Sequence, residues 1–351
     1  MSTILIKNGT LIDGSGSKRY LADILIENEK IKKIGKLDLT ADKVIDASGK
    51  IVSPGFIDTH SHSDLKVLIE PFVEPKIKQG ITTEILGQDG ISMAPLPEEY
   101  VSSWRKNLAG LDGDSDELKW DWKNTDGYLN LISKTGSGPN ELYLVPHGNI
   151  RMEAMGLEAR VATKEELEKM KEITRREMEA GVAGLSTGLI YIPCAYAETE
   201  ELIEICKVAA EYGIPLVIHQ RSEADTMLES MQEVIRIAKE SGVKIHFSHF
   251  KICGQKNWKL IEPVIALLDK CKEEGINVSY DQYPYVAGST MLGVILPPWA
   301  HAGGTDKLIE RLKDKSLREK MKEDIIKGIP GWDNFIDFAG FDGIYVTSVK
   351  T

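Results

Sequence analysis

Histidines that recur at similar places are the residues of this chain with the clearest chemical potential. Only seven occur in 351 residues, and His60, His62, His219 and His249 each fall at the end of a short apolar run. Neutral imidazoles bind zinc and similar ions. A His-x-His pair on a strand can reach one ion, because alternate residues of a strand project to the same side. The pattern therefore predicts a metal site made from these four residues.

Asp89 stands where it could complete that site. It lies in LGQDGIS, residues 86–92, directly after the apolar run TTEIL. A short acidic stretch between glycines is also typical of an Asx-type turn. A carboxylate, however, joins imidazoles readily in the ligand shell of zinc and related ions, and its two oxygens can bridge a pair of ions. Its place after the second apolar run, next to the run that carries His60 and His62, favours the ligand interpretation.

The other three histidines fit the pattern less well. His147 also ends an apolar run and is expected to line the cavity, with or without binding metal. His246 shares a side of its run with Ser248 and not with His249, so a structural role is expected. His301 has no such placement and stays unassigned.

Seven apolar runs, separated by amphipathic helical patterns, indicate the fold. Helical periodicity is clearest in residues 164–181, 198–213 and 224–242. Strands that alternate with helices form a parallel sheet, eight such units close a (β/α)₈ TIM-type barrel, and its active site lies at the carboxyl ends of the strands. The seven predicted strands are residues 56–62, 82–86, 141–148, 183–187, 215–220, 244–249 and 276–284.

The two ends of the chain differ from this pattern. The first fifty residues resemble short antiparallel strands, which predicts a small β-sandwich part over 1–53 and a barrel over 54–351. Insertions are predicted near 93–125 and 297–330, the second with a charged helix around 305–327. After the seventh strand only one strand-like run, GIYVTSV, is visible. An eighth barrel strand and sandwich strands to pair with the first fifty residues are therefore expected to be missing.

Composition excludes several classes. The net charge of −11 argues against a general nucleic-acid binder. Neither a signal peptide nor an apolar run of membrane-spanning length is recognised. Four cysteines at unpatterned spacings indicate reduced thiols and predict a cytoplasmic protein.

Several longer stretches together resemble the metal-dependent amidohydrolases, and among them the D-aminoacylase (N-acyl-D-amino-acid deacylase) group. The stretches are PGFIDTHSHSD, GQDGISMAPL, GLSTGLIYIPCAYAETEEL, VIHQRSE, SHFKICGQKNW and DQYPYVAGSTMLGVILPPW. The resemblance covers nearly the whole chain. It implies a (β/α)₈ barrel with a β-sandwich formed by strands from both ends of the chain.

The resemblance also implies roles for the metal ligands. His219 and His249 match tight zinc ligands, and His60 and His62 match the pair that can serve a weaker second position. Asp89 stands where the best-known members carry a cysteine in Gly-Asn-Cys-Gly. Because carboxylate is harder than thiolate, manganese or another ion becomes an alternative to zinc, and one or two ions remain possible. No lysine ends the fourth strand, so a bridging carbamylated lysine has no evident source.

Further family positions concern the substrate. Lys251, Tyr283 and Ser289 match contacts to a substrate carboxylate, and Tyr191 matches a residue that lines the pocket. Arg221 and Glu223, in HQRSE, are expected to support His219 from behind.

One family residue has no counterpart. The proton-shuttling aspartate follows the eighth strand in a Gly-Ser-Asp-Gly-like segment, and Asp342 in GFDG precedes a strand-like run and is not assigned. The resemblance thus implies hydrolysis of the amide of an N-acyl (D-)amino acid, with the aspartate supplied by a second polypeptide that carries the missing barrel and sandwich segments. A homo-oligomer, a hydrolase of cyclic amides, ureides or imides, and a non-catalytic metal-binding scaffold remain alternatives.

Overall fold

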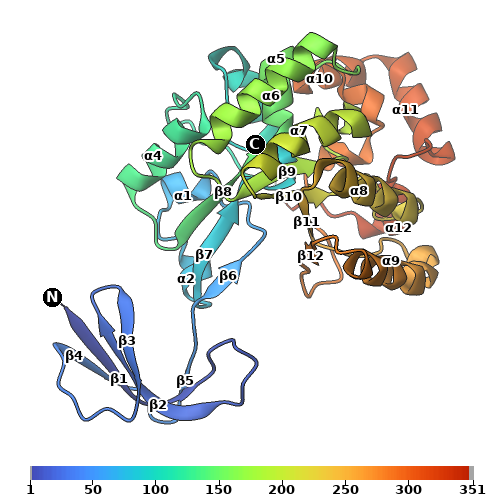
Figure 1. Ribbon diagram of the computed structural model, residues 1–351. Coiled ribbons are helices and arrows are strands. Elements are labelled where there is room, and N and C mark those ends of the chain that lie inside the picture. The colour runs from blue at the N-terminus through green and yellow to red at the C-terminus, as the bar shows by residue number, and fades with distance from the viewer. Residues whose placement is uncertain (1, 348–351) are drawn as a thin grey trace. The chain divides into compact units, whose positions relative to one another are not determined.

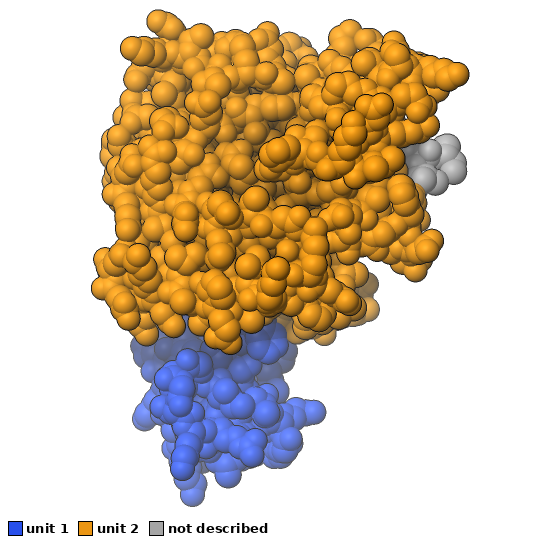
Figure 2. All heavy atoms as spheres, turned by 90° about the vertical axis from the view of Figure 1, so that its right-hand side faces the viewer, with its two compact units in different colours: residues 1–56 blue, residues 57–351 orange. Residues whose placement is uncertain are grey.

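The computed structural model describes residues 2–347 and divides into two compact units, residues 1–56 and 57–351 (Figure 2). The first unit is a single five-stranded sheet made of β1 (Thr3–Leu11), β2 (Tyr20–Glu27), β3 (Lys30–Gly35), β4 (Lys43–Asp46) and β5 (Ile51–Val52). The pairs β1–β2 and β2–β3 are antiparallel, as predicted. β4 and β5 pair with β1 in parallel, so the prediction of an antiparallel arrangement was wrong there. The reason is that the chain crosses from β3, at one edge, to the far side of β1 before β4 begins.

This sheet has a small core on its own. Leu11, Ala22 and Ile24 are buried together, while Leu21 is 77% exposed and Ile31 is 62% exposed. A sheet normally covers its apolar face with a second layer. Within the described residues the first unit therefore forms one layer of the predicted sandwich.

The second unit contains the seven predicted barrel strands in one sheet. Each strand from β7 to β12 pairs in parallel with its neighbour, and β6 joins at the other side of β7. They lie side by side in chain order in Figure 1. The strands are β6 (Phe56–Asp58), β7 (Ile81–Leu86), β8 (Asn140–Pro146), β9 (Gly184–Gly188), β10 (Pro215–His219), β11 (Lys244–Phe247) and β12 (Val278–Tyr280). β6 and β12 are both edges, so the sheet is an open part of a barrel over residues 2–347.

The three predicted amphipathic helices are confirmed as α6 (Lys164–Met178), α7 (Thr199–Glu211) and α8 (Met227–Ser241), which pack beside one another (Figure 1). A capping box between Thr163 and Glu166 begins α6. Each helix buries an apolar stripe, such as Met227, Met231 and Val234 of α8, against the strands. α9 (Ile261–Glu273) follows β11 in the same way. These helices pack along the strands and leave the carboxyl ends of the strands available for the candidate metal-binding side chains.

The predicted insertions have structure of their own. Residues 93–125 contain η2 (Glu98–Tyr100) and α3 (Val101–Leu108), and α4 (Thr125–Thr135) begins where they end. The charged helix expected around 305–327 is two helices, α10 (Thr305–Lys313) and α11 (Lys315–Lys327). Asp314 separates them, because its backbone is extended and its side chain caps the start of α11.

The remaining helices are short. They are α1 (Lys66–Ile69), α2 (Glu74–Ile77), η1 (Gln88–Gly90), α5 (His147–Met155), η3 (Cys194–Tyr196), η4 (Gln255–Leu260), η5 (Leu292–Ile295), η6 (Pro298–His301), α12 (Phe335–Ala339) and η7 (Phe341–Gly343). The strand predicted from GIYVTSV is not present over residues 344–347, and its last residues lie outside the described part of the chain. No helix in residues 2–347 is both long and apolar enough to cross a membrane. All four cysteines are free.

Candidate metal centre

The loop that carries Asp89 depends on its two glycines. Gly87 and Gly90 have φ of +79° and +73°, where L side chains are disfavoured. A Cβ on Gly87 would lie 2.1 Å from the Leu144 carbonyl oxygen, and one on Gly90 would lie 2.7 Å from Thr187 Cα. Asp89 itself has φ of +57°. The loop is thus pressed against β8 and β9 in a strained backbone conformation, which is a common property of functional sites.

Neighbouring polar groups hold this loop in place. Gln88 Nε2 donates to the carbonyl oxygens of Thr59 and Ile85 at 2.9 and 2.8 Å. The Gly87 N–H donates to Asp64 Oδ1 at 2.8 Å. These contacts connect the end of β7 with the segment after β6, which carries His60 and His62.

Asp89 lies between the two predicted pairs of histidines. Its Oδ2 is 3.3 Å from His62 Nε2 and 3.6 Å from His60 Nε2. Its Oδ1 is 3.5 Å from His249 Nε2 and 4.0 Å from His219 Nδ1. The structure therefore brings together all five residues proposed as ligands, with one carboxylate oxygen directed to each pair.

The histidines reach this place from different positions relative to their strands. His219 is the last residue of β10, whereas His249 lies two residues beyond β11 and has φ of +36°. β6 ends at Asp58, so His60 and His62 lie after the strand and not on it. The expectation that strand alternation would direct this pair was wrong in that detail. The segment after β6 performs this task, held by the Gln88 contact to Thr59.

The charges of the centre shift its pKa values strongly. Against the effect of burial, the surrounding histidines hold the pKa of Asp89 well below its usual value, so this carboxylate is ionised at neutral pH. Burial, together with the positive charges of His249 and Lys251, lowers the pKa of His219 to about 3. His249 behaves oppositely: although burial opposes it, the carboxylates of Glu223 and Asp89 raise its pKa to about 9.

The donor set fits a divalent cation. Asp89 Oδ1 is buried without a hydrogen-bond partner among the described residues, which is costly for a carboxylate oxygen. His219 Nδ1 and His249 Nε2 lie 2.8 Å apart beside it. In each of the sets His60–His62–Asp89 and Asp89–His219–His249, the ligand atoms lie within 4.8 Å of one another. Imidazole nitrogens and a carboxylate are suitable ligands for zinc and for other divalent ions of the first transition series.

Lys251 and Tyr283 lie together beside the centre. Lys251 Nζ is 2.6 Å from Glu223 Oε2 and donates to the His249 carbonyl oxygen at 3.0 Å. It also lies 5.4 Å from the centre of the Tyr283 ring. Ser289 is exposed on the loop that continues from Tyr283, and it forms no hydrogen bond with Lys251 or Tyr283 in the described structure. Two of the three predicted carboxylate contacts are thus adjacent, and the third is not joined to them.

Tyr191 packs against the ring of His219. Its ring meets the imidazole edge-on, with centroids 5.4 Å apart, and its hydroxyl is 2.9 Å from Thr290 Oγ1. Tyr191 also borders an apolar pocket lined by residues such as Met291, Val294 and Phe335. It is therefore placed between the candidate centre and a pocket, as a residue that lines a substrate site would be.

The expected support of His219 was partly wrong. Arg221 pairs with Glu233 at 2.8 Å and donates to the Ala197 carbonyl oxygen, so it holds a loop and does not contact His219. Glu223 lies within hydrogen-bond reach of His249 Nδ1, at 2.9 Å, but 4.0 Å from His219 Nε2. Its reach across to β11 cannot be inferred from its position in HQRSE.

The remaining three histidines lie within hydrogen-bond distance of other residues of the chain. His147 is fully buried, with its ring nitrogens 2.9 Å from Thr187 Oγ1 and 2.8 Å from Glu201 Oε1. His246 contacts Ser279 and Asp281, and Asp281 in turn accepts a hydrogen bond from the His249 backbone N–H. His301 Nε2 is 3.0 Å from the Gly293 carbonyl oxygen. None of the three directs a free nitrogen to Asp89.

Sequence reasoning missed two buried acids beside His62. Asp112, in the insertion after α3, lies 3.2 Å from His62 Nδ1. Asp64 accepts hydrogen bonds from the Gly87 N–H and the Ser92 hydroxyl. Burial and the proximity of Asp112 raise the pKa of Asp64 well above its usual value. Asp64 could have been noticed as the next acid after His-x-His, but no spacing in the sequence connects Asp112 with His62.

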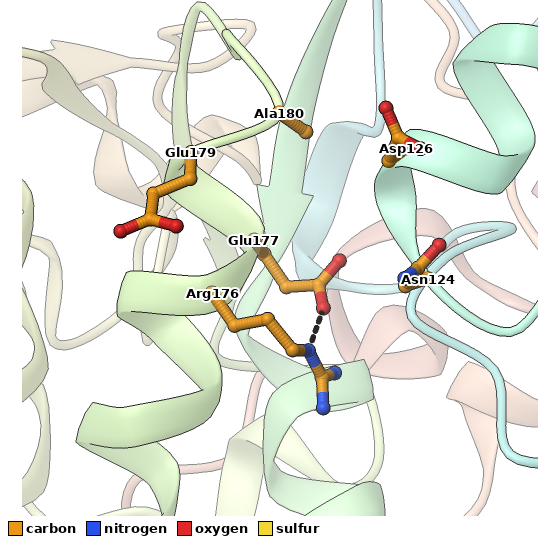
Figure 3. A pocket seen from close by; sticks show the side chains of 6 residues that line it. All are labelled: Asn124, Asp126, Arg176, Glu177, Glu179 and Ala180. Carbon is orange, nitrogen blue, oxygen red and sulfur yellow. Dashed lines mark hydrogen bonds and ion pairs between the residues drawn. The ribbon is translucent and has the colours of Figure 1, made fainter.

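A separate hollow contains none of these residues. Its volume is about 210 Å³, and it lies where α4 begins and α6 ends (Figure 3). There Arg176 pairs with Glu177 at 2.6 Å, and Glu177 accepts a hydrogen bond from the Thr125 N–H at 2.7 Å. These contacts fasten the start of α4 to α6, so the hollow is explained by helix packing.

Comparisons with known proteins place the chain in a family. Residues 43–197 match the model of the "Amidohydrolase family". D-aminoacylase of Alcaligenes xylosoxydans xylosoxydans is 36% identical over 290 residues, which are 82% of this chain and 58% of that protein. The chain thus spans somewhat less than two thirds of the length of this relative.

Solved structures show the same relationship. N-acyl-D-glutamate deacylase from Bordetella bronchiseptica, complexed with zinc and a phosphonate inhibitor, superposes with a TM-score of 0.75 at 35% identity, over 80% of this chain and 58% of that one. A D-aminoacylase with a binuclear metal centre superposes with a TM-score of 0.77 at 32% identity, over 91% of this chain and 69% of that one. The chain therefore belongs to the amidohydrolase family and, within it, to the D-aminoacylase group.

Proposed function

We propose that this chain is the metal-binding part of a hydrolase that cleaves the amide bond of N-acyl amino acids, D-isomers among them. The observation that carries the proposal is the position of Asp89, with one oxygen directed to His60 and His62 and the other to His219 and His249. Relatives that cleave N-acyl-D-amino acids support it. These five residues would hold one or two divalent ions, with zinc favoured and manganese as the alternative. A bound ion would polarise the amide carbonyl and lower the pKa of a water.

The protein's own groups would orient the site and the substrate. Glu223 fixes the ring of His249 through Nδ1, so that Nε2 is directed to Asp89. Lys251 would hold the substrate carboxylate, assisted by Tyr283 and Ser289. Lys251 is suited to this task because, although burial opposes it, the Glu223 carboxylate keeps its pKa above the usual lysine value and the ammonium stays charged. Tyr191 would border the substrate beside His219.

The group that accepts the water's proton is proposed to lie outside these 351 residues. Within residues 2–347 no unassigned carboxylate occupies the end of an eighth strand, and Asp342 is exposed in η7. A segment from a second polypeptide, or from further along a longer chain, would fill the gap between β6 and β12 and bring an aspartate. That carboxylate would take a proton from water and pass it to the leaving amine as the C–N bond breaks, which yields a carboxylic acid and a free amino acid.

The test is an assay in two arms. The 351-residue chain, loaded with zinc or with manganese, is offered N-acyl-D- and N-acyl-L-amino acids, and a hydantoin as a cyclic alternative. The same panel is repeated after co-expression with the segment that completes the barrel. We expect turnover of N-acyl amino acids only in the second arm. Robust turnover by the chain alone would contradict the proposed source of the aspartate. Turnover of the hydantoin alone, or of nothing in either arm, would contradict the proposed substrate class.

A further inference from the structure

Asp112 comes from outside the strands of the barrel and still reaches the candidate centre. It lies in the insertion of residues 93–125, just after α3, and its side chain is fully buried against His62. Its Oδ1 is 3.2 Å from His62 Nδ1, and its Oδ2 has no hydrogen-bond partner among the described residues. A buried carboxylate with a single partner requires an explanation, because an unpaired one is costly. The imidazole of His62 is the group that stabilises it.

The insertion holds Asp112 firmly. The Asp112 N–H donates to the Leu108 carbonyl oxygen at 2.9 Å, which fixes it to the end of α3. α3 in turn is anchored by Trp104, whose indole N–H donates to the Ser92 carbonyl oxygen at 2.7 Å. Arg105 of α3 pairs with Asp114 just beyond, at 2.7 Å. The carboxylate is therefore presented by a fixed turn and not by a long flexible loop.

The contact with Asp112 favours one nitrogen of His62 for the centre. A carboxylate oxygen accepts hydrogen bonds, so the neutral ring satisfies Asp112 at 3.2 Å when its hydrogen is on Nδ1. The lone pair of the neutral ring is then on Nε2, the atom that lies 3.3 Å from Asp89 Oδ2. This is the arrangement in which a carboxylate orients a histidine that binds a metal.

His60 has no equivalent partner. Its Nδ1 is buried without a hydrogen bond among the described residues, and the nearest carboxylate oxygen, on Asp281, is 3.9 Å away. His249, in contrast, has Glu223 at 2.9 Å. One carboxylate thus orients each side of Asp89: Asp112 on the His60–His62 side and Glu223 on the His219–His249 side.

We propose that Asp112 is a positioning residue for His62, and that it controls the ion bound by His60, His62 and Asp89 separately from the ion bound by His219 and His249. The inference rests on the proposed metal centre. It adds that the insertion, through Asp112, affects ion affinity at this centre in addition to Glu223. The related D-aminoacylase with a binuclear centre is described as activated by one metal and attenuated by a second. A residue that changes the affinity of one ion position alone would then change how much of the protein carries one ion and how much carries two.

The test is a metal titration of the full chain after removal of metal with a chelator. Zinc is titrated against a chromophoric chelator to resolve two affinities, and cobalt spectra report the ligand geometry at each position. Asp112→Asn keeps the size and one acceptor oxygen, and Asp112→Ala removes both. We expect the ion at the His60–His62 position to bind about 10–100-fold more weakly in Asp112→Ala, with an intermediate loss in Asp112→Asn, and the other ion to change by less than about threefold.

Two further variants make the result specific. Glu223→Gln should show the opposite selectivity, and Asp121→Asn, an exposed acid of the same insertion, should change neither affinity. Equal weakening of both ions together with a loss of stability in the metal-free protein would overturn the inference in favour of a structural role. So would unchanged affinities.

Failure of this inference is distinguishable from failure of the proposed function. If the unaltered chain binds no ion, the metal centre itself is wrong. If it binds one ion that is lost on substitution of His219 and not of His62, the centre survives and the role of Asp112 is wrong. If it binds two ions and Asp112→Ala does not discriminate between them, only the positioning role fails.

Discussion

At the scale of single residues, this protein places a carboxylate where best-known family members are expected to carry a thiolate. Asp89 is buried, ionised and directed at four imidazole rings. Burial and nearby charges move the pKa values of two of these rings apart, to about 3 for His219 and about 9 for His249. A carboxylate offers one oxygen to each pair of histidines, whereas a thiolate would offer a single sulfur. Oxygen is also the harder ligand, so the centre should accept manganese more readily than a thiolate centre does.

The protonation of His249 predicts that metal binding releases a proton and depends on pH. Its pKa of about 9 in the metal-free protein means that the ring carries a proton at pH 7.5, and a ligand must be neutral. Zinc binding at pH 7.5 should therefore release about one proton for the ion at His249, and affinity should rise with pH until about pH 9. Calorimetry of zinc binding in two buffers of different ionisation enthalpy measures this release. Binding without proton release at pH 7.5 would contradict the assignment of His249 as a ligand.

Lys251 supports a second prediction at this scale. In the enzyme completed by its missing segment, Lys251→Met should raise KM for an N-acyl amino acid about 10–100-fold, because a charged hydrogen bond is lost. The matched substrate is the same N-acyl amino acid with its carboxylate converted to a carboxamide. It keeps the bond that is cleaved but lacks the carboxylate, so both proteins should hydrolyse it equally. Metal content, measured in parallel, must stay the same, since Lys251 also contacts Glu223. An equal loss on both substrates would show that Lys251 does not recognise the carboxylate.

At the scale of elements, the turn made of Gly87 and η1, directly after β7, positions Asp89 in the centre. Gly90→Ala should destabilise the chain, because a Cβ would meet Thr187 Cα at 2.7 Å and the residue has φ of +73°. Gly242→Ala is the matched control: its φ is +77°, but its Cβ would meet nothing within 4 Å. We expect about 1–2 kcal/mol lost in Gly242→Ala from conformation alone, and about 1–3 kcal/mol more in Gly90→Ala from overpacking. Urea unfolding of the metal-free proteins measures both, and equal losses would contradict the packing argument.

The elements also show what the sequence could and could not predict. The seven barrel strands follow from short apolar runs between helical patterns, and three of the helices follow from periodicity, because each helix buries an apolar stripe. His219 and His249 could be predicted because one ends β10 and the other lies two residues beyond β11. Asp112 and the reach of Glu223 to His249 could not, since they depend on where an insertion and a loop fold back. The parallel pairing of β4 and β5 likewise depends on a crossover that local alternation does not reveal.

At the scale of the whole molecule, the open sheet is the dominant feature. β6 and β12 are unpaired edges within the described residues, with Ile57 61% and Tyr280 55% exposed. Edges of this kind are sites for another strand, and they favour aggregation when left uncovered. We therefore expect the segment that completes the barrel to bind here.

Stability measures this binding without activity. The complementary segment at about one hundred times its Kd should stabilise the chain by about 2.7 kcal/mol, which raises Tm by roughly 5 °C or more and lowers binding of a hydrophobic dye. A segment with a scrambled sequence is the control. An unchanged Tm with the native segment, at concentrations that saturate binding elsewhere, would show that the open edges are not its site.

The most direct test of the central claim is the metal content of the purified chain and of its Asp89→Ala variant, measured by mass spectrometry after equilibration with zinc. Asp89 joins both pairs of histidines, so the account predicts that the unaltered chain retains one or two ions, that His60→Ala loses at most one, and that Asp89→Ala loses affinity at both positions. Metal content in Asp89→Ala equal to that of the unaltered chain would contradict the account.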